Sequence, residues 1–358
     1  MMMVKLNSRY RYFVYGAAFL LYAFLAACPV PPETVFVPQW LQSLTSGYPQ
    51  AEILEESLVP FDFGGNFGYV SPGGNFTINQ ARSGYLAQSE RLFAEFSGKD
   101  EKIEVRDFLN RAVFTLNDKR GYPFFRDKRI FIISSEQHSI SETDKTNNIL
   151  WSFDFSSPVT CVDAAAGLLL VGELDGTLEL IDGGGKRLYT AEPSGSRIPA
   201  IYGCAISASG TKIAAVSGLD HQRFLVIELD GGVWRITHHE FLDEGFRRPV
   251  HVKFVDNERR VVYEREDGLG IYHLDSRSSE RVPIDGRILH IEDSPEDRMI
   301  FLISSESAVQ KNLIAIRYPS SKVISAPFTS ADTFLKIHER LLLIGGGKKL
   351  AAFNIEKM

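Results

Sequence analysis

The 358-residue sequence contains only three cysteines, at positions 28, 161 and 204. It has no C-x-x-C pair and no H-E-x-x-H motif, so the usual spacings of zinc ligands are absent. It also has no G-x-S-x-G elbow. Helical periodicity is scarce, and only Gln39 to Leu58 and Glu90 to Phe96 favour a helical turn or two. We therefore predict a strand-rich protein that is not an enzyme, with no catalytic residues, no metal and no cofactor.

The N-terminus departs from the composition of the rest. Lys5, Arg9 and Arg11 precede an uncharged run from Tyr12 to Cys28, and a Pro-rich break follows at residues 29 to 32. A positive segment followed by an apolar one is typical of a signal peptide. The run is also at the short limit for a membrane-spanning helix. We therefore interpret residues 1–28 as a signal peptide or a membrane anchor.

The run ends in Leu-Ala-Ala-Cys, which resembles the lipobox of bacterial lipoproteins, although Pro29 departs from that pattern. The resemblance implies that Cys28 is a lipid attachment site. An uncleaved N-terminal helix and plain secretion are the alternatives. In each case the cations on the N-terminal side place the remaining chain outside the cytoplasm. We expect a membrane-anchored protein on the periplasmic face, held by lipid at Cys28 or by the helix.

Without residues 1–28 the chain has 36 Lys and Arg against 45 Asp and Glu, a net charge of −9. An acidic body disfavours nucleic acid as a partner. It also disfavours a broad electrostatic contact with anionic lipids, so the N-terminus should make the membrane link.

A repeat organises the rest of the chain. LLLVG at 168–172 recurs as LLLIG at 341–345, a separation of about four periods of 43 residues, and a period of 40–50 residues in a strand-rich chain is typical of β-propellers. Further apolar strand cores fall between and before these two, and the strand that follows them often ends on an acid that should accept backbone N–H bonds in a turn. The apolar cores are Phe76–Ile78, Ile130–Ile133, Leu168–Val171, Ile213–Val216, Val261–Tyr263, Met299–Ile303 and Leu341–Ile344, and the acids are Asp144, Asp182, Asp230, Asp275 and Glu356.

We predict an all-β fold, a propeller of seven or eight four-stranded antiparallel blades over residues 61–358, preceded by an N-terminal membrane-targeting helix. The last repeat ends too early to supply its fourth strand. A segment of the 29–60 linker should then close the ring, because an unpaired sheet edge is unfavourable. Thr34–Trp40 and Leu58–Phe63 are the candidates.

The stretch from Ile149 to Tyr189 resembles the repeats of the quinoprotein-like and WD40-like propeller superfamily. It resembles in particular the repeats of the propeller lipoprotein of outer-membrane protein assembly. The resemblance implies a radial propeller and leaves function open. The vicinal cysteines of quinoprotein dehydrogenases are absent.

Three local features invite a chemical interpretation, and each has a structural one. His238 and His239 stand next to each other in an alternating segment, which sends neighbouring side chains to opposite faces and prevents joint chelation. Cys161 and Cys204 occupy equivalent places in neighbouring repeats. They are either small buried residues that pack between strands or a redox pair. The Gly-rich runs 183–185 and 345–347 lack the P-loop spacing and favour hairpin turns.

One connection between repeats looks suited to contact with a partner. Phe246, Arg247 and Arg248 combine an aromatic ring with arginines, as interface hot spots do. A solvated loop is the alternative interpretation. The sequence thus favours a scaffold in the bacterial cell envelope that binds other envelope proteins. An enzyme of the funnel type and a periplasmic small-ligand sensor stay open, so a small-molecule ligand is not excluded.

Overall fold

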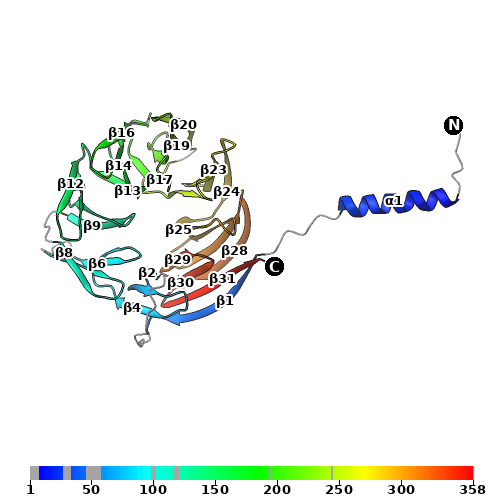
Figure 1. Cartoon of the computed structure of the whole chain (residues 1–358), viewed down its shortest axis with the longest axis horizontal. Coiled ribbons are helices and arrows are strands. Elements are labelled where there is room, and N and C mark those ends of the chain that lie inside the picture. The colour runs from blue at the N-terminus through cyan, green and yellow to red at the C-terminus, as the bar shows by residue number, and fades with distance from the viewer. Residues whose placement is uncertain are drawn as a thin grey trace. The chain divides into compact units, whose positions relative to one another are not determined.

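The computed structural model describes residues 8–26, 34–45, 58–97, 102–116, 121–193, 195–242 and 245–357. In these residues the strands form eight sheets, seven of four strands and one of three. Within the compact unit Pro38–Asn354 the sheets stand radially around a central axis (Figure 1). Each sheet is one blade of a β-propeller, and we number the blades 1 to 8 along the chain.

Blades 1 to 4 comprise the strands of the first half of the ring. They are β2 (Val59–Phe63), β3 (Asn66–Val70) and β4 (Phe76–Ala81); β5 (Tyr85–Gln88), β6 (Leu92–Phe96), β7 (Ile103–Asp107) and β8 (Ala112–Leu116); β9 (Gly121–Arg126), β10 (Arg129–Ser134), β11 (Ser139–Thr143) and β12 (Ile149–Asp154); and β13 (Val159–Ala165), β14 (Leu168–Glu173), β15 (Leu178–Ile181) and β16 (Arg187–Ala191).

Blades 5 to 8 complete the ring, and the last of them includes a strand from the start of the chain. They are β17 (Ile201–Ile206), β18 (Lys212–Ser217), β19 (Arg223–Asp230) and β20 (Val233–Phe241); β21 (Val252–Val255), β22 (Arg260–Arg265), β23 (Gly268–His273) and β24 (Ser278–Pro283); β25 (Arg287–Ser294), β26 (Met299–Ser305), β27 (Gln310–Arg317) and β28 (Ser321–Thr329); and β29 (Thr333–His338), β30 (Leu341–Gly346), β31 (Lys349–Lys357) and β1 (Thr34–Ser43).

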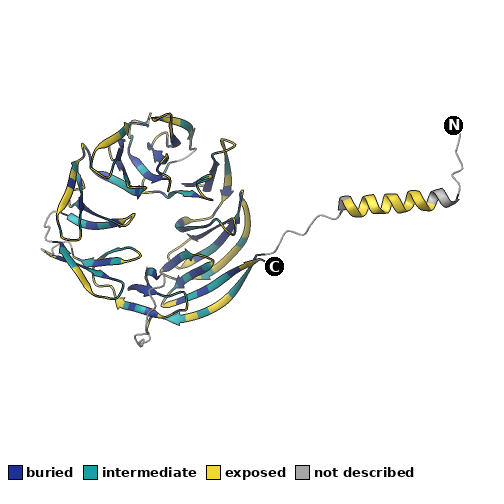
Figure 2. Cartoon of the chain, viewed as in Figure 1, coloured by how far each residue is buried: buried dark blue, intermediate teal, exposed yellow. Residues whose placement is uncertain are grey.

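The middle strands of the blades are covered on both faces. In β14 and β26 nearly every residue is buried, whereas most residues of the outer strand β28 are exposed (Figure 2). A middle strand packs against a neighbouring blade on each side, so both of its faces must be apolar and its sequence is a continuous apolar run. This requirement explains why the LLLVG-type repeats could be recognised in the sequence.

The hydrophobic cores lie between blades. Phe131 and Trp151 of blade 3 pack with Leu169 and Val171 of blade 4, and comparable clusters join blades 4 and 5, 5 and 6, and 6 and 7. The first strands of successive blades also touch, as β13 does with β17 and β17 with β21. In the part of the chain that the structure describes, the blades share their cores, so each depends on its neighbours.

β1 closes the ring. It lies beside β31 as the outer strand of blade 8, and the Leu44 amide that follows it donates to the Lys348 carbonyl at 2.9 Å. Trp40 then reaches blade 1, where its indole N–H donates to the Pro72 carbonyl at 2.7 Å. The candidate Thr34–Trp40 thus lies in the closing strand, while Leu58–Phe63 largely forms β2 of blade 1.

The sequence left the number of blades at seven or eight, and the structure has eight. The additional sheet, β5–β8, fills the long interval between the apolar cores at Phe76 and Ile130. The helical expectation for Glu90–Phe96 is wrong, because Leu92–Phe96 forms β6 and buries Phe93 and Ala94 between blades. It is also wrong for the start of Gln39–Leu58, since β1 runs to Ser43.

The helix α1 (Ser8–Ala26) belongs to the other compact unit and is described by itself. Its large apolar side chains from Tyr12 to Phe24 are exposed. Within the described residues, we find no helix with the length and apolar character needed to cross a membrane. Cys28 lies outside the described residues.

Two of the acids predicted at strand ends accept backbone N–H bonds in the turns that follow the strands. Oδ1 of Asp182 accepts the amides of Gly184 and Lys186, both at 2.9 Å. Asp144 accepts hydrogen bonds from Thr146 and Asn148, which lower the pKa of its carboxyl to about 2. The run 183–185 is thus a hairpin turn between β15 and β16, as predicted.

A half-buried carboxyl links blades 6 and 7. Asp293 of β25 accepts the Asp256 amide at 2.8 Å and the Tyr318 hydroxyl. Burial raises the pKa of Asp293 to about 6, against the lowering effect of the Tyr318 hydrogen bond. The folded protein therefore holds this proton more tightly than the unfolded chain does.

Replacing Trp40 with alanine should loosen the ring closure. We expect Trp40→Ala to lower the free energy of unfolding by about 2 kcal/mol, because a half-buried indole and its hydrogen bond are lost. Urea denaturation of the purified protein measures this. Leu41→Ala is the matched control, since Leu41 is 63% exposed and its truncation should have little effect. Equal losses in the two variants would contradict the role of Trp40.

The Asp293 carboxyl should make stability depend on pH. Its pKa is higher in the folded than in the unfolded state, so its contribution is fully present below pH 4 and is lost as the pH rises through 6. Between pH 4 and pH 7 the wild-type free energy of unfolding should fall, relative to Asp293→Asn, by on the order of 2 kcal/mol. Urea denaturation of both proteins at the two pH values tests this, and a difference that does not change with pH would refute it.

Candidate docking face

The connections around blade 5 meet at one end of its sheet. Ile201 pairs with Ser217, Ser217 with Arg223, and Arg223 with Phe241. The segments 195–200, 218–222 and 245–251 therefore lie at the same end of the sheet, and we call this surface the loop face. The turns at 207–211 and 231–232 lie at the opposite end.

A buried glutamine holds two of these segments together. Gln222 is 1% exposed. Its side-chain amide donates to the carbonyls of Gly218 at 3.1 Å and Phe246 at 3.3 Å, and its Oε1 accepts the Phe246 amide at 3.3 Å. Gly245 suits this close approach, because a Cβ there would overlap the Leu219 carbonyl oxygen. The segment carrying the predicted contact residues is thus fixed in place.

The third segment is tied to the same loop through Asp220. The Ser196 hydroxyl donates to its carboxylate, and Nε of Arg197 lies 3.3 Å from Oδ2. The Ser196 hydrogen bond, the Asp220 amide and Arg197 hold the pKa of Asp220 well below its usual range. The Leu219 amide also donates to the Ile198 carbonyl at 3.0 Å. All three segments therefore form one braced surface.

The structure divides the predicted contact residues into two kinds. The Arg248 guanidinium makes two hydrogen bonds to the buried Glu264, at 2.6 and 3.0 Å, and lies over the Phe246 ring at 4.3 Å from its centroid. Phe246 in turn packs against the core between blades 5 and 6. Arg248 and Phe246 therefore support the loop, while Arg247 is exposed.

Arg247 lines a pocket of about 440 Å³ on the loop face, which we call the loop pocket. Ile198 in its wall is 50% exposed, and the Arg197 side chain is 93% exposed. The remaining lining residues are Leu219, Asp220 and Gly245. The pocket thus combines apolar side chains with two arginines, a composition typical of protein-binding sites.

Sequence reasoning missed Arg197, Ile198, Leu219 and Gln222. Ile198 directly follows the polar stretch of residues 194 to 197, but a single apolar residue in a loop is common, so it did not mark a site by itself. That the three connections share one end of the sheet follows only from the strand register.

The other chemical candidates have structural roles. His238 stacks on Tyr272 at 4.1 Å, and burial lowers its pKa, while its neighbour His239 is exposed. Cys161 and Cys204 are free thiols in β13 and β17, and contact with Cys161 together with burial raises the pKa of Cys204. Across the described ranges, no three His, Cys, Asp or Glu side chains gather as metal ligands would.

The two neighbouring arginines should respond differently to truncation. Arg248→Ala leaves the Glu264 carboxylate buried without its partner, so we expect a loss of about 2 to 3 kcal/mol in the free energy of unfolding. Arg247→Ala, its matched control, should change stability by less than about 0.5 kcal/mol. Denaturant titration measures both. A large loss on truncating Arg247 would contradict its assignment as an exposed surface residue.

Comparison with known proteins agrees with the propeller fold. The crystal structure of BamB from Moraxella catarrhalis superposes with a TM-score of 0.59 at 10% identity, covering 89% of this chain and all of that one. The computationally designed Ika8 protein gives 0.62 at 14% identity, covering 84% and 94%. A chain of the mitotic checkpoint complex gives 0.55 at 12% identity, covering 91% and 94%. At these identities the likeness concerns the fold alone.

A relative in sequence is an uncharacterized protein of Treponema pallidum (strain Nichols), 24% identical over 314 residues, which covers 85% of this chain and 83% of the relative. A family model described as beta-propeller protein matches residues 2–358. With eight radial sheets in the described residues, the chain belongs to the beta-propeller protein family.

Proposed function

We propose that this propeller is a protein-binding scaffold of the bacterial cell envelope and that the loop face is its docking surface. The observation that carries the proposal is the loop pocket. Its exposed Ile198, Arg197 and Arg247 stand on loops that the buried Gln222 and the Ser196–Asp220 bond hold rigid. A surface fixed before binding loses little conformational entropy when a partner docks.

The charge of the protein supports a protein partner over other macromolecules. Beyond residue 28 the chain has a net charge of −9, which opposes binding to nucleic acid or to anionic lipid heads. In the loop pocket Arg197 is paired with Asp220, and Arg247 leaves a net positive charge, which suits a short partner segment with acidic and apolar side chains.

The similarities to known proteins also favour a protein-binding role. The repeats resemble those of the propeller lipoprotein of outer-membrane protein assembly, and a structural neighbour is BamB. Another neighbour is a chain of the mitotic checkpoint complex, a protein assembly. These similarities motivate the proposal for this chain, and the loop face supplies its physical basis.

The N-terminus is the proposed membrane tether. The α1 side chains from Tyr12 to Phe24 are predominantly apolar and exposed, with Arg9 and Arg11 on their N-terminal side. A lipid at Cys28 would leave the propeller tethered outside the cytoplasm.

Charge reversal on the loop face should abolish partner capture. We expect the double variant Arg197→Glu, Arg247→Glu to lose, by at least about tenfold, the envelope proteins that crosslink to the tagged wild type in intact membranes, since each reversal costs more than 1.4 kcal/mol. Lys186→Glu is the control, because Lys186 is exposed on the turn after β15, at the opposite end. Equal recovery from all three proteins would exclude the loop face as the docking surface.

Removing the tether should release the protein without unfolding it. If Cys28 carries the lipid, Cys28→Ala should remain unlipidated, as intact-mass measurement shows, and should shift from the membrane pellet toward the soluble fraction. A variant that stays in the membrane points to an uncleaved helix. A protein recovered from the cytoplasm in either form would contradict the extracytoplasmic placement.

A further inference from the structure

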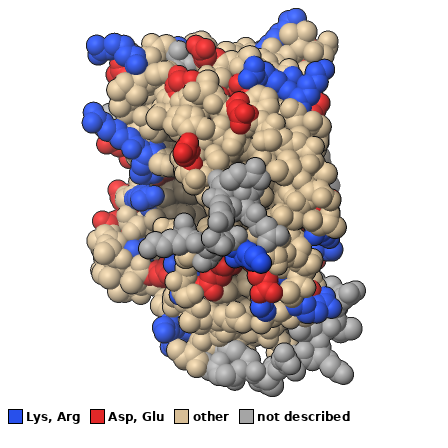
Figure 3. Space-filling view, turned by 90° about the vertical axis from the view of Figure 1, so that its left-hand side faces the viewer, with Lys and Arg blue, Asp and Glu red and all other residues tan. Residues whose placement is uncertain are grey.

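A second cavity is separate from the loop face. It has a volume of about 910 Å³ and lies between the inner strands of blades 2 and 3, β5 and β9. We call it the trough. Elsewhere around the ring, inner strands are linked by hydrogen bonds, such as those from Thr160 to Ile201 and from the Ile206 amide to Asp163. The side of the ring that carries blades 2 and 3 is visibly hollowed in the space-filling view (Figure 3).

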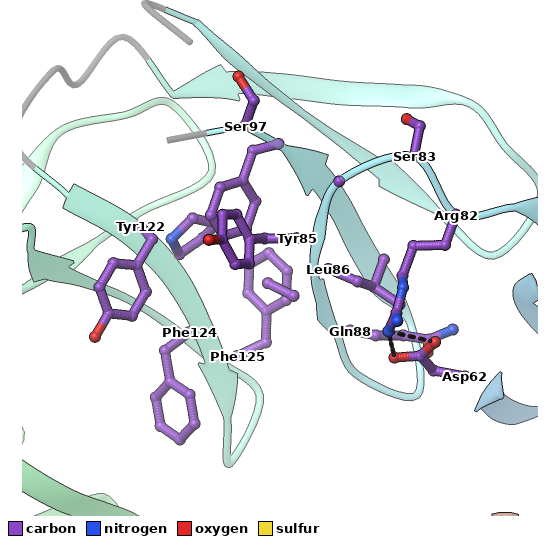
Figure 4. Close-up of a pocket in the computed structure, with 14 residues that line it drawn as sticks. Asp62, Arg82, Ser83, Tyr85, Leu86, Gln88, Ser97, Tyr122, Phe124 and Phe125 are labelled. Atoms are coloured by element: carbon purple, nitrogen blue, oxygen red, sulfur yellow. Dashed lines mark hydrogen bonds and ion pairs between the residues drawn. The ribbon is translucent and has the colours of Figure 1, made fainter. Parts of the chain in front are cut away.

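One part of the trough is aromatic. Tyr122 and Phe124 of β9 are half-buried, while Tyr85 of β5 is 68% exposed and its ring lies 5.9 Å from the Phe96 ring. Figure 4 shows Tyr122, Phe124 and Tyr85 on the side away from Arg82 and Asp62. An exposed tyrosine supported by a second ring offers a flat surface that is already fixed in place.

The other part is polar but carries no net charge. Arg82 and Asp62 form an ion pair in which Nη1 donates to both carboxylate oxygens, at 3.0 and 2.8 Å. A guanidinium has five N–H groups and a carboxylate about four acceptor positions, so both groups have capacity left for a ligand. Gln88 also lines the trough, and its side-chain amide donates to the Gly68 carbonyl at 2.8 Å.

We propose that the trough binds a neutral oligosaccharide. A pyranose ring has an apolar C–H face and a rim of hydroxyls, which match the aromatic part and the paired Arg82, Asp62 and Gln88 respectively. A charged ligand would need an unpaired charge in the lining, and the Arg82–Asp62 pair is neutral as a whole. A flat aromatic ligand would need a closed apolar slot, whereas here polar groups line one side.

The test uses the full chain in a detergent without a sugar headgroup, because a glycosidic detergent would compete. Isothermal titration calorimetry with N-acetylchitotetraose and with maltotetraose should give a dissociation constant below about 1 mM for at least one of them. Tyr85→Ala should weaken that binding at least about tenfold, since it removes an exposed stacking surface and leaves the core intact. Phe241→Ala is the matched control, because Phe241 is 55% exposed and lies at the end of β20, outside the trough.

Either of two results would overturn the proposal: no heat from either oligosaccharide at about 5 mM, or binding that survives Tyr85→Ala. Binding of an uncharged peptide such as penta-alanine in place of both sugars would assign the trough to another ligand class. The experiment is independent of the docking surface, because none of its outcomes depends on Arg197 or Arg247.

Discussion

The structure depends on ring closure by β1. Each blade shares its apolar core with its neighbours, as the cluster of Phe131, Trp151, Leu169 and Val171 does between blades 3 and 4. A ring of this kind has no complete core until its ends meet. β1 supplies the outer strand of blade 8, and Trp40 and Leu44 join the core that blade 8 shares with blade 1. Closure also removes the exposed edge that β31 would otherwise present.

Much of the architecture was predictable, because the middle strands of a propeller must be apolar on both faces. That requirement produced the recurrent LLLVG-type runs and allowed the fold class and the closing segment near Thr34–Trp40 to be inferred. The count stayed at seven or eight because blade 2 lacks such a run. Its strand β6 reads LFAEF, whose apolar residues fit helical spacing as well as strand spacing, and only burial between blades 1 and 3 decides the matter.

The candidate site was predictable only in part. An aromatic residue beside two arginines indicated the segment around Phe246, but the sequence could not show that Arg248 pairs with Glu264 while Arg247 faces solvent. That distinction depends on Glu264 in a neighbouring strand. Ile198 and Leu219 join Arg247 because three connections leave blade 5 at one end. The trough likewise could not be predicted from the sequence, since Tyr85 and Tyr122 belong to different blades.

The central claim is that the loop face at one end of blade 5 is built for docking and that the opposite end of the ring is not. Photocrosslinking in intact membranes tests this most directly, with a photoreactive amino acid at Ile198 on the loop face or at Lys186, on the turn after β15 at the opposite end of the neighbouring blade 4. The account predicts discrete crosslinked products with envelope proteins from position 198 and none from position 186. Equal products from both positions, or products from position 186 alone, would contradict it.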